Sequence, residues 1–308
     1  MNNLSKKFLI AVCGPTAAGK TAIAIKLAQH FTTEIISADS RQFYKEMEVG
    51  TAKPSTEELN LVPHHFINSH SIQDKVSVAD FEKAALEKLE YLFQKHDVVI
   101  IVGGSGLFLQ AVYQGLDNLP EVSVQEREKW NQLYQEFGLN YLQEQLQNLD
   151  PEYYKQVDLQ NPQRIIRALE VCSSNGKPFS SFLTQTKKQR FFNTIKIGIN
   201  PDRAVLYNQI NLRVDEMVKN GLVEEVLQLQ NYKHLNALNT VGYKELFTAF
   251  DEKIPVKEAL EKIKQNTRNF AKRQITWFKK DQEIVWFDAA NLDPILTYLL
   301  DNYQLSNS

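Results

Sequence analysis

The residues of this chain with the clearest chemical meaning form one short run near its amino terminus. The run G-P-T-A-A-G-K-T consists of Gly14, Pro15, Thr16, Ala17, Ala18, Gly19, Lys20 and Thr21. It follows an apolar, strand-like stretch, 8–13, and opens a stretch whose apolar residues have helical spacing, 21–28. Loops of this kind surround a phosphate with backbone N–H groups, place a lysine on a terminal phosphate and offer a hydroxyl to Mg²⁺. The run therefore predicts a phosphate site served by Lys20 and Thr21.

The acidic partner expected of a nucleotide hydrolase is missing from its usual place. A second buried strand, predicted at 98–102, ends in Gly103-Gly104, where many such enzymes carry a metal-binding aspartate. Asp39 instead ends a short predicted strand, 34–39. In a parallel sheet the carboxyl ends of both strands open onto the crevice of the phosphate loop, so Asp39 is the candidate acid. Its position alone equally allows a simple turn-capping role.

The elements that must position these residues alternate between strand and helix up to about residue 117. From about 118 to 183 the sequence has only helical spacing, and a strand at 194–199 then resumes the earlier pattern. Helices follow, with one more strand at 284–287. We expect an α/β fold with a P-loop-type parallel sheet core flanked by helices, formed by 1–117 and 184–308, and an inserted all-helical lobe at 118–183.

Composition limits the classes of protein that the chain can belong to. Its 308 residues, 43% of them hydrophobic, suffice for two folded domains and exclude a disordered protein. A net charge of −2 gives no global sign of nucleic-acid binding. Two segments without acidic residues are nevertheless candidate phosphate contacts: the 262–280 basic segment and the 171–201 basic segment. An ordinary solvated helix is the alternative for the 262–280 basic segment.

The two cysteines, Cys13 and Cys172, do not have the spacing of a zinc site and are typical of a reducing compartment. No segment approaches the ~20 apolar residues of a membrane-spanning helix. We therefore expect a cytoplasmic protein without a membrane partner.

Several further motifs occur in a fixed order along the chain. They are D-S-R-Q-F-Y-K-E-M (39–47), G-T-A-K-P (50–54), P-H-H-F (63–66), G-G-S-G-L-F (103–108), N-P-Q-R-I-I-R-A-L-E-V (161–171), R-V-D-E-M-V-K-N-G-L (213–222), T-V-G-Y-K-E (240–245) and A-K-R-Q-I-T-W-F (271–278). With the phosphate loop, this series closely resembles the tRNA dimethylallyltransferase family of bacterial type. The resemblance spans all but about the last thirty residues and is far more specific than the loop alone.

The resemblance implies transfer of a dimethylallyl group from dimethylallyl diphosphate to N6 of the adenosine 3′ of the anticodon, with diphosphate as leaving group. Lys20, Thr21 and Mg²⁺ would stabilise the leaving diphosphate, and Arg213 would bind it too. Without the resemblance, Arg213 is better explained as a surface arginine paired with Asp215 or Glu216. Asp39 would accept the proton from the adenine amine.

The family's tRNA contacts map onto two groups of positions here. We expect tRNA binding, around an adenine flipped out of the anticodon loop, by Asp39, Ser40, Arg41, Gln42, Ser105, Arg127, Gln163, Arg164, Ile165, Ile166 and Arg167. The resemblance also implies that the helical lobe closes over the anticodon stem. We expect the enzyme to be a monomer.

Three other classes of protein share part of this pattern. A small-molecule or nucleotide kinase shares the loop, sheet and helical lid, and an adenylate isopentenyltransferase transfers the same group to a free nucleotide. The two basic segments and Q-R-I-I-R favour tRNA over a free nucleotide. A GTP-binding switch is disfavoured because the guanine-reading N-K-x-D motif is absent.

Overall fold

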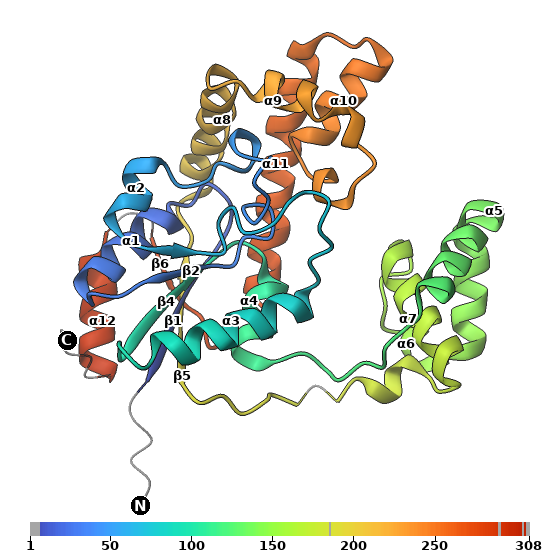
Figure 1. Cartoon of the computed structure of the whole chain (residues 1–308), viewed down its shortest axis with the longest axis horizontal. Helices are drawn as coiled ribbons and strands as arrows, with labels where there is room; N and C mark the ends of the chain where they lie inside the picture. The colour runs from blue at the N-terminus through green and yellow to red at the C-terminus, as the bar shows by residue number, and fades with distance from the viewer. Residues whose placement is uncertain (1–6, 185, 289–290, 304, 306–308) are drawn as a thin grey trace, which may run out of the picture. The chain divides into compact units, whose positions relative to one another are not determined.

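The computed structural model describes residues 7–184, 186–288, 291–303 and 305, which form two compact units. The first consists of Met1–Gln114 and Gln189–Ser308, and the second is Gly115–Lys188 (Figure 1). Each has its own hydrophobic core.

The first unit is built on one sheet of six strands. Its strands are β1 (Phe8–Cys13), β2 (Ile35–Ser37), β3 (His64–His65), β4 (Val98–Val102), β5 (Asn193–Ile199) and β6 (Val285–Phe287). Their order is β3-β2-β4-β1-β5-β6, and every pair is parallel. This confirms the predicted parallel α/β core, and strands were predicted at β1, β2, β4, β5 and β6. The edge strand β3 was not predicted.

Helices cover the sheet, and further helices of the same unit lie beside it (Figure 1). They are α1 (Lys20–His30), α2 (Thr56–Leu61), α3 (Val78–Leu92), α4 (Gly106–Gln114), α8 (Arg203–Lys219), α9 (Leu222–Gln228), α10 (Tyr243–Glu252), α11 (Val256–Phe278) and α12 (Asp293–Tyr303), with 3₁₀ turns η1 (Val49–Thr51), η3 (Gln230–Tyr232) and η4 (Asn236–Leu238). Helices α9 and α10 and parts of α8 and α11 enclose a separate apolar cluster around the buried Tyr243.

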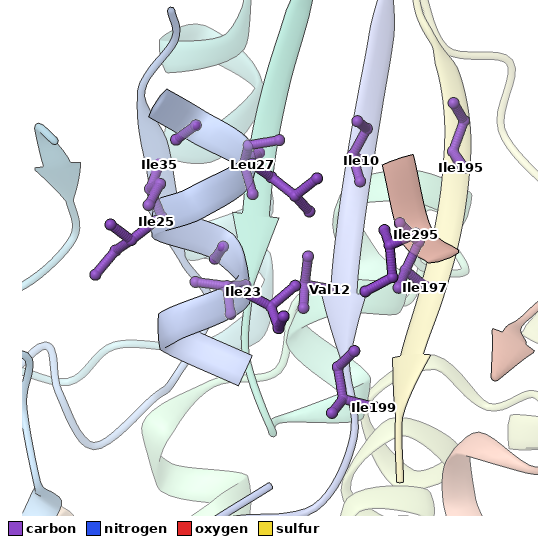
Figure 2. Close-up of a cluster of buried hydrophobic side chains, with 14 of the residues drawn as sticks. Ile10, Val12, Ile23, Ile25, Leu27, Ile35, Ile195, Ile197, Ile199 and Ile295 are labelled. Carbon is purple, nitrogen blue, oxygen red and sulfur yellow. The ribbon is translucent and has the colours of Figure 1, made fainter. Parts of the chain in front are cut away.

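The central strands β1 and β4 are buried on both faces of the sheet, as expected from their continuously apolar sequences. In β1, Ile10 and Val12 pack with α1, α8 and α12, whereas Leu9 and Ala11 face α3 and α4 on the other side. Figure 2 shows the first of these clusters, in which residues of β1 and β5 meet α1. Two packed faces hold β1 rigidly, so the loop that leaves its carboxyl end has a fixed base.

The second unit is helical in its described residues. It contains α5 (Val124–Leu149), α6 (Pro151–Tyr154), α7 (Pro162–Asn175) and the 3₁₀ turn η2 (Phe179–Phe182). Helix α5 is interrupted at Gly138, whose φ of 76° lies in the left-handed region that glycine tolerates. Trp130, Leu142 and Leu169 are among the residues of its core. Because α5 and α7 bury their apolar faces against each other, the unit has the packing of an independent helical domain.

Candidate active site

The phosphate loop lies between β1 and α1, as predicted. Three of its residues have positive φ: 136° at Gly14, 61° at Ala17 and 82° at Gly19. Such alternation turns successive N–H groups toward one concave side, which is the geometry of an anion nest. A side chain on Gly14 would collide with the carbonyl oxygen of Ile199 on β5, so the loop requires glycine there. The sequence thus forms a cradle for an anion at the amino end of α1.

Lys20 is held over this cradle by the loop itself. Its Nζ donates a hydrogen bond of 2.6 Å to the carbonyl oxygen of Pro15. Burial lowers the pKa of Lys20, Asp39 opposes that shift and Arg213 adds to it, and the net pKa falls from 10.5 to about 8. These three side chains are therefore within electrostatic reach of one another, although they come from three separate segments of the chain.

Arg213 extends from α8 toward the same place. Its Nη2 donates a hydrogen bond of 3.1 Å to the carbonyl oxygen of Ala52. Burial lowers its pKa, and the charges of Asp39 and Glu58 counteract that shift. The alternative of a surface ion pair is not what the structure contains, because Asp215 pairs with Lys264 and Glu216 with Lys219. A half-buried arginine beside a lysine, with no carboxylate bonded to it among the described residues, is a suitable binding group for a polyanion.

Asp39 follows β2 and caps the next turn as well as facing the site. Its Oδ1 accepts a hydrogen bond of 3.1 Å from the Arg41 N–H, the pattern of an Asx turn. The neighbouring Ser40 makes two hydrogen bonds to Ser105. Its N–H donates to the Ser105 hydroxyl at 3.3 Å, and the two hydroxyls are also 3.3 Å apart. The order β2-β4-β1 in the sheet brings the loops that carry Asp39, Ser105 and Lys20 side by side at the carboxyl edge.

The next two predicted tRNA contacts make internal bonds. Arg41 Nη1 donates to the carbonyl oxygens of Asn236 and Ala237, at 3.0 and 2.9 Å. Gln42 is 9% exposed, and its Nε2 donates to the carbonyl oxygens of Thr51 and Ala52, at 3.3 and 3.2 Å. The amide of Gln42, an expected tRNA contact, therefore holds the 51–52 backbone.

Sequence reasoning missed two residues that shape this region. Gln274 of α11 is buried; its Oε1 accepts from the Thr16 N–H at 2.8 Å and its Nε2 donates to the Gly104 carbonyl at 2.9 Å. Neither bond has a local signal in the sequence. The position lies inside a quoted motif, A-K-R-Q-I-T-W-F, which was the only pointer to it.

Glu225 of α9 is the second missed residue. Its carboxylate accepts the N–H groups of Glu48, Val49 and Gly50, at 2.9, 2.7 and 3.0 Å, and the Tyr243 hydroxyl at 2.6 Å. Burial, and then the charge of Glu225, raise the pKa of Tyr243, which keeps that hydroxyl a donor. The carboxylate thereby fixes the turn that presents Ala52 to Arg213.

In the helical unit, the predicted tRNA contacts divide into a core part and a surface part. Ile165 and Ile166 are 0% and 3% exposed and belong to the core, so packing accounts for these two side chains. Gln163 and Arg164, which directly precede the two isoleucines, are exposed at the start of α7. Their side chains are therefore accessible on this unit, unlike those of the two isoleucines.

Arg127 and Arg167 are joined by one buried carboxylate. Glu170 is 1% exposed; it accepts from Arg127 Nε and Nη2 at 2.9 and 2.8 Å and from Arg167 Nη1 at 2.6 Å. Burial alone would raise the pKa of Glu170, but these hydrogen bonds lower it. Together with Glu170, the two arginines carry one net positive charge. Their hydrogen bonds to Glu170 hold them in a fixed geometry at the surface of the unit.

The two basic segments behave differently. In the 171–201 basic segment, Lys196 is 6% exposed and pairs with Asp281 and Glu283 at 2.6 and 2.7 Å, while Arg190 pairs with Glu82 at 2.6 Å. These two cations stabilise the fold, so the prediction of phosphate contacts is wrong for them. Their acidic partners are distant in sequence, which is why the segment looked unbalanced.

The 262–280 basic segment lies mostly on α11 and keeps several exposed cations. They are Lys262, Lys272, Arg273, Lys279 and Lys280. Lys264 instead pairs with Asp215 and Glu261, and Arg268 donates to Asn211. A groove of about 530 Å³ near the start of the segment is lined by Glu258 and Glu261 as well as by lysines, so its charge is mixed. Phosphate contact is better matched by the second half of the segment.

The described residues have neither a preformed cluster of metal ligands nor a membrane-spanning helix. They contain no group of three or more His, Cys, Asp or Glu side chains arranged to hold a metal ion. A Mg²⁺ ion held by the Thr21 hydroxyl would thus have to receive most of its ligands from a bound diphosphate and water, which is how Mg²⁺ commonly binds. Among the same residues, no helix is long and apolar enough to span a bilayer.

Comparison with known proteins places this arrangement in a family. The IPP transferase family model matches residues 42–281. The tRNA dimethylallyltransferase of Christiangramia forsetii is 57% identical over 281 residues, covering 91% of this chain and 93% of the relative. That of Flavobacterium johnsoniae is 50% identical over 307 residues, covering 97% and 99%.

Solved structures agree with the sequence comparisons. The tRNA isopentenylpyrophosphate transferase of Bacillus halodurans superposes with a TM-score of 0.70 at 32% identity, covering 96% of this chain and 95% of that one. A eukaryotic dimethylallyltransferase acting on tRNA has the same fold, with a TM-score of 0.78 at 24% identity, covering 97% and 77%. From the family match and these relatives together, the chain belongs to the tRNA dimethylallyltransferase (IPP transferase) family.

Proposed function

We propose that this chain transfers a dimethylallyl group from dimethylallyl diphosphate to N6 of the adenosine 3′-adjacent to the anticodon in tRNA. The products are N6-isopentenyladenosine and diphosphate. One observation carries the proposal: Lys20, Arg213 and Asp39 converge beside an amide cradle at the carboxyl edge of the sheet. Two cations and a cradle suit a diphosphate, and one carboxylate beside them suits an acceptor that must lose a proton.

The donor is bound through its diphosphate. Backbone N–H groups of the 14–21 loop surround it, except at Pro15, which has none, and at Thr16, whose N–H is bound by Gln274. Lys20 exchanges its bond to Pro15 for a phosphate oxygen, and Arg213 binds from the side of α8. Glycines replace the acid after β4, which is consistent with a reaction in which no phosphoryl group moves. The chain's cations stabilise the charge that grows on the oxygen of the breaking C–O bond.

Mg²⁺ fits this site as an ion that enters with the diphosphate. The Thr21 hydroxyl at the start of α1 is the protein ligand in this proposal. When bound, the ion neutralises charge on the leaving diphosphate and so makes it a better leaving group.

The acceptor side is organised by Asp39. N6 of adenine attacks the allylic carbon, the C–O bond to diphosphate breaks with its electron pair going to diphosphate, and a proton passes from N6 to Asp39. An exocyclic amine is a weak nucleophile, so a positioned acceptor both orients it and removes this proton. The adenine must leave its stack to reach the carboxylate, which costs a few kcal/mol and least in a single-stranded loop.

Two groups of residues are proposed to bind the tRNA. Near Asp39 they are Ser40 and Ser105, which already bond each other. On the helical unit they are Gln163 and Arg164 at the start of α7 and the arginine pair of Arg127 and Arg167. Planar guanidinium groups fixed by Glu170 suit phosphodiester oxygens. The helical unit is proposed to close over the anticodon stem, and the enzyme to act as a cytoplasmic monomer.

A transfer assay with matched variants tests the proposal. Labelled dimethylallyl diphosphate is offered separately to total tRNA, AMP and ATP, and we expect label in tRNA alone. Asp39→Asn keeps the shape of the side chain but not its basicity, so single-turnover transfer should fall about 10²–10⁴-fold. The exposed Asp301→Asn serves as control for the same chemical change. Efficient labelling of AMP with none of tRNA would refute the assignment of substrate.

A further inference from the structure

Gln274 connects two loops of the site through one buried amide. Its Oε1 accepts from the Thr16 N–H of the phosphate loop at 2.8 Å, and its Nε2 donates to the Gly104 carbonyl after β4 at 2.9 Å. The side chain is 6% exposed, and α11 buries Ala271 and Phe278 on either side of it. An amide in such surroundings is stable only when both of its ends are bonded, so the two contacts depend on each other.

From this geometry we propose that Gln274 is a positioning residue that couples the diphosphate cradle to the loop beside Asp39. The proposal rests on the function proposed above. The bonded path runs from Thr16 through Gln274 to Gly104, and then along the chain to Ser105, which bonds Ser40 next to Asp39. Through it, the position of the cradle and the position of the acceptor are set by one side chain.

The two hydrogen bonds and the glycine at 104 restrict which residue types can form this bridge at position 274. The bridge needs a donor and an acceptor attached to the same carbon, an arrangement that amide side chains and protonated carboxyls supply. A side chain on Gly104 would collide with Gln274 Nε2, so glycine at 104 makes the approach possible. Because Gln274 holds the Thr16 N–H, the peptide planes next to it cannot rotate without breaking that bond. The remaining N–H groups of the loop are thereby kept aimed at the anion.

A purely structural role makes a different prediction. If Gln274 only attached α11 to the sheet, its loss would lower thermal stability while the folded enzyme kept its affinity for diphosphate. A positioning role places the loss in diphosphate affinity and in the transfer step, measured on folded protein well below its melting temperature.

The test uses inorganic diphosphate as probe, with binding measured by calorimetry. Gln274→Met keeps length and apolar packing but loses both hydrogen bonds, and we expect its diphosphate affinity to fall about tenfold, the effect of one to two lost hydrogen bonds. The exposed Gln94→Met, beyond α3 at the opposite edge of the sheet, is the matched control and should bind as the wild type does. A folded Gln274→Met with wild-type diphosphate affinity and transfer rate overturns the proposal.

Gly104→Ala, alone and combined with Gln274→Met, tests the same hydrogen-bonded bridge from its other end. Gly104→Ala displaces the amide without changing residue 274, and we expect the same loss of diphosphate affinity. Combined with Gln274→Met, it should add little, because both changes break one connection. Full additivity of the two losses overturns the proposal.

Gln274→Glu allows the bridge to be broken and restored in one variant by a change of pH. The carboxylate faces the Gly104 carbonyl with no proton to donate, whereas the protonated acid restores the bridge. Position 274 is buried, and burial raises the pKa of a carboxyl placed there. We therefore expect weakened diphosphate binding at pH 8 that is partly regained at pH 6, relative to the wild type at each pH. A deficit that does not change between these values contradicts the proposal. Wild-type protein that binds diphosphate but transfers nothing to tRNA would instead refute the proposed function.

Discussion

The lowered pKa of Lys20 predicts that donor binding weakens in mild alkali. Burial brings that pKa to about 8, with Arg213 contributing and Asp39 opposing. Bound diphosphate needs the protonated ammonium, so apparent affinity falls as pH rises through this value. With a pKa of about 8, the fraction of free enzyme in the competent form drops about tenfold between pH 7 and pH 9. With the ordinary value of 10.5, the change would be only a few per cent.

Calorimetric binding of dimethylallyl diphosphate between pH 7 and pH 9.5 measures this directly. Titrations in buffers of different ionisation heat report proton uptake, which should be about 0.1 proton at pH 7 and about 0.9 at pH 9. In Lys20→Arg the cation stays charged throughout, so its affinity should be independent of pH in this range, whatever its absolute value.

Two results would refute this reasoning. One is wild-type affinity that stays constant up to pH 9, because Lys20 would then keep an ordinary pKa despite its burial. The other is a fall of the same size in Lys20→Arg, because the titrating group would then lie elsewhere.

The lowered pKa of Lys20 also makes the stability of the folded chain depend on pH. Between the two pKa values the unfolded chain binds more protons at Lys20 than the folded chain does, so this group alone makes folding more favourable as pH rises through about 8. Donor binding and stability thus respond to pH in opposite directions.

The remaining predictions concern two hydrogen-bonded carboxylates, the half-buried Glu225 and the buried Glu170. Glu225→Gln removes charge from a group that accepts three backbone N–H groups, and we expect a loss of about 2 kcal/mol in the free energy of unfolding by urea denaturation, with exposed Glu224→Gln unchanged within error. Glu170→Gln makes the helical unit more positive, which by charge alone would tighten tRNA binding. If the fixed geometry of the arginine pair matters, filter binding will instead show weaker affinity; tighter binding would contradict the role given to Glu170.

The parts of the fold that could be predicted from the sequence are those with local signals. Strand β1, the phosphate loop and α1 follow one another within 8–30, and each is defined by neighbours in the chain. The strand β4 was equally recognisable, because five consecutive apolar residues end at a glycine pair. Strand β3 has only two residues, too few for any periodicity to be seen.

The long-range contacts of the site could not be predicted in this way. Gln274 and Thr16 are 258 residues apart, and Glu225 lies 175 residues from Gly50. A hydrogen bond between such residues depends on the packing of whole helices and leaves no pattern near either partner. The same holds for Lys196, whose acidic partners are 85 and 87 residues away.

Residue type alone could not show which predicted contacts also have a role inside the fold. Gln42 has the amide of a base-reading residue, but an amide binds buried backbone carbonyls equally well, as it does at Thr51 and Ala52. Ile165 and Ile166 share a motif with exposed Gln163 and Arg164, yet helical geometry turns them toward the core. A motif identifies the segment, and the helix decides which of its side chains can touch a partner.

The two oxygens of Asp39 have separate tasks. Oδ1 is bound by the Arg41 N–H, while Oδ2 has no bond to another group in the described part of the chain. In the proposed reaction the proton from N6 binds to Oδ2, and the hydrogen bond from the Arg41 N–H to Oδ1 is kept. The acid and base forms then differ in a single hydrogen and not in the course of the backbone, so the enzyme can begin the next turnover without rebuilding that turn.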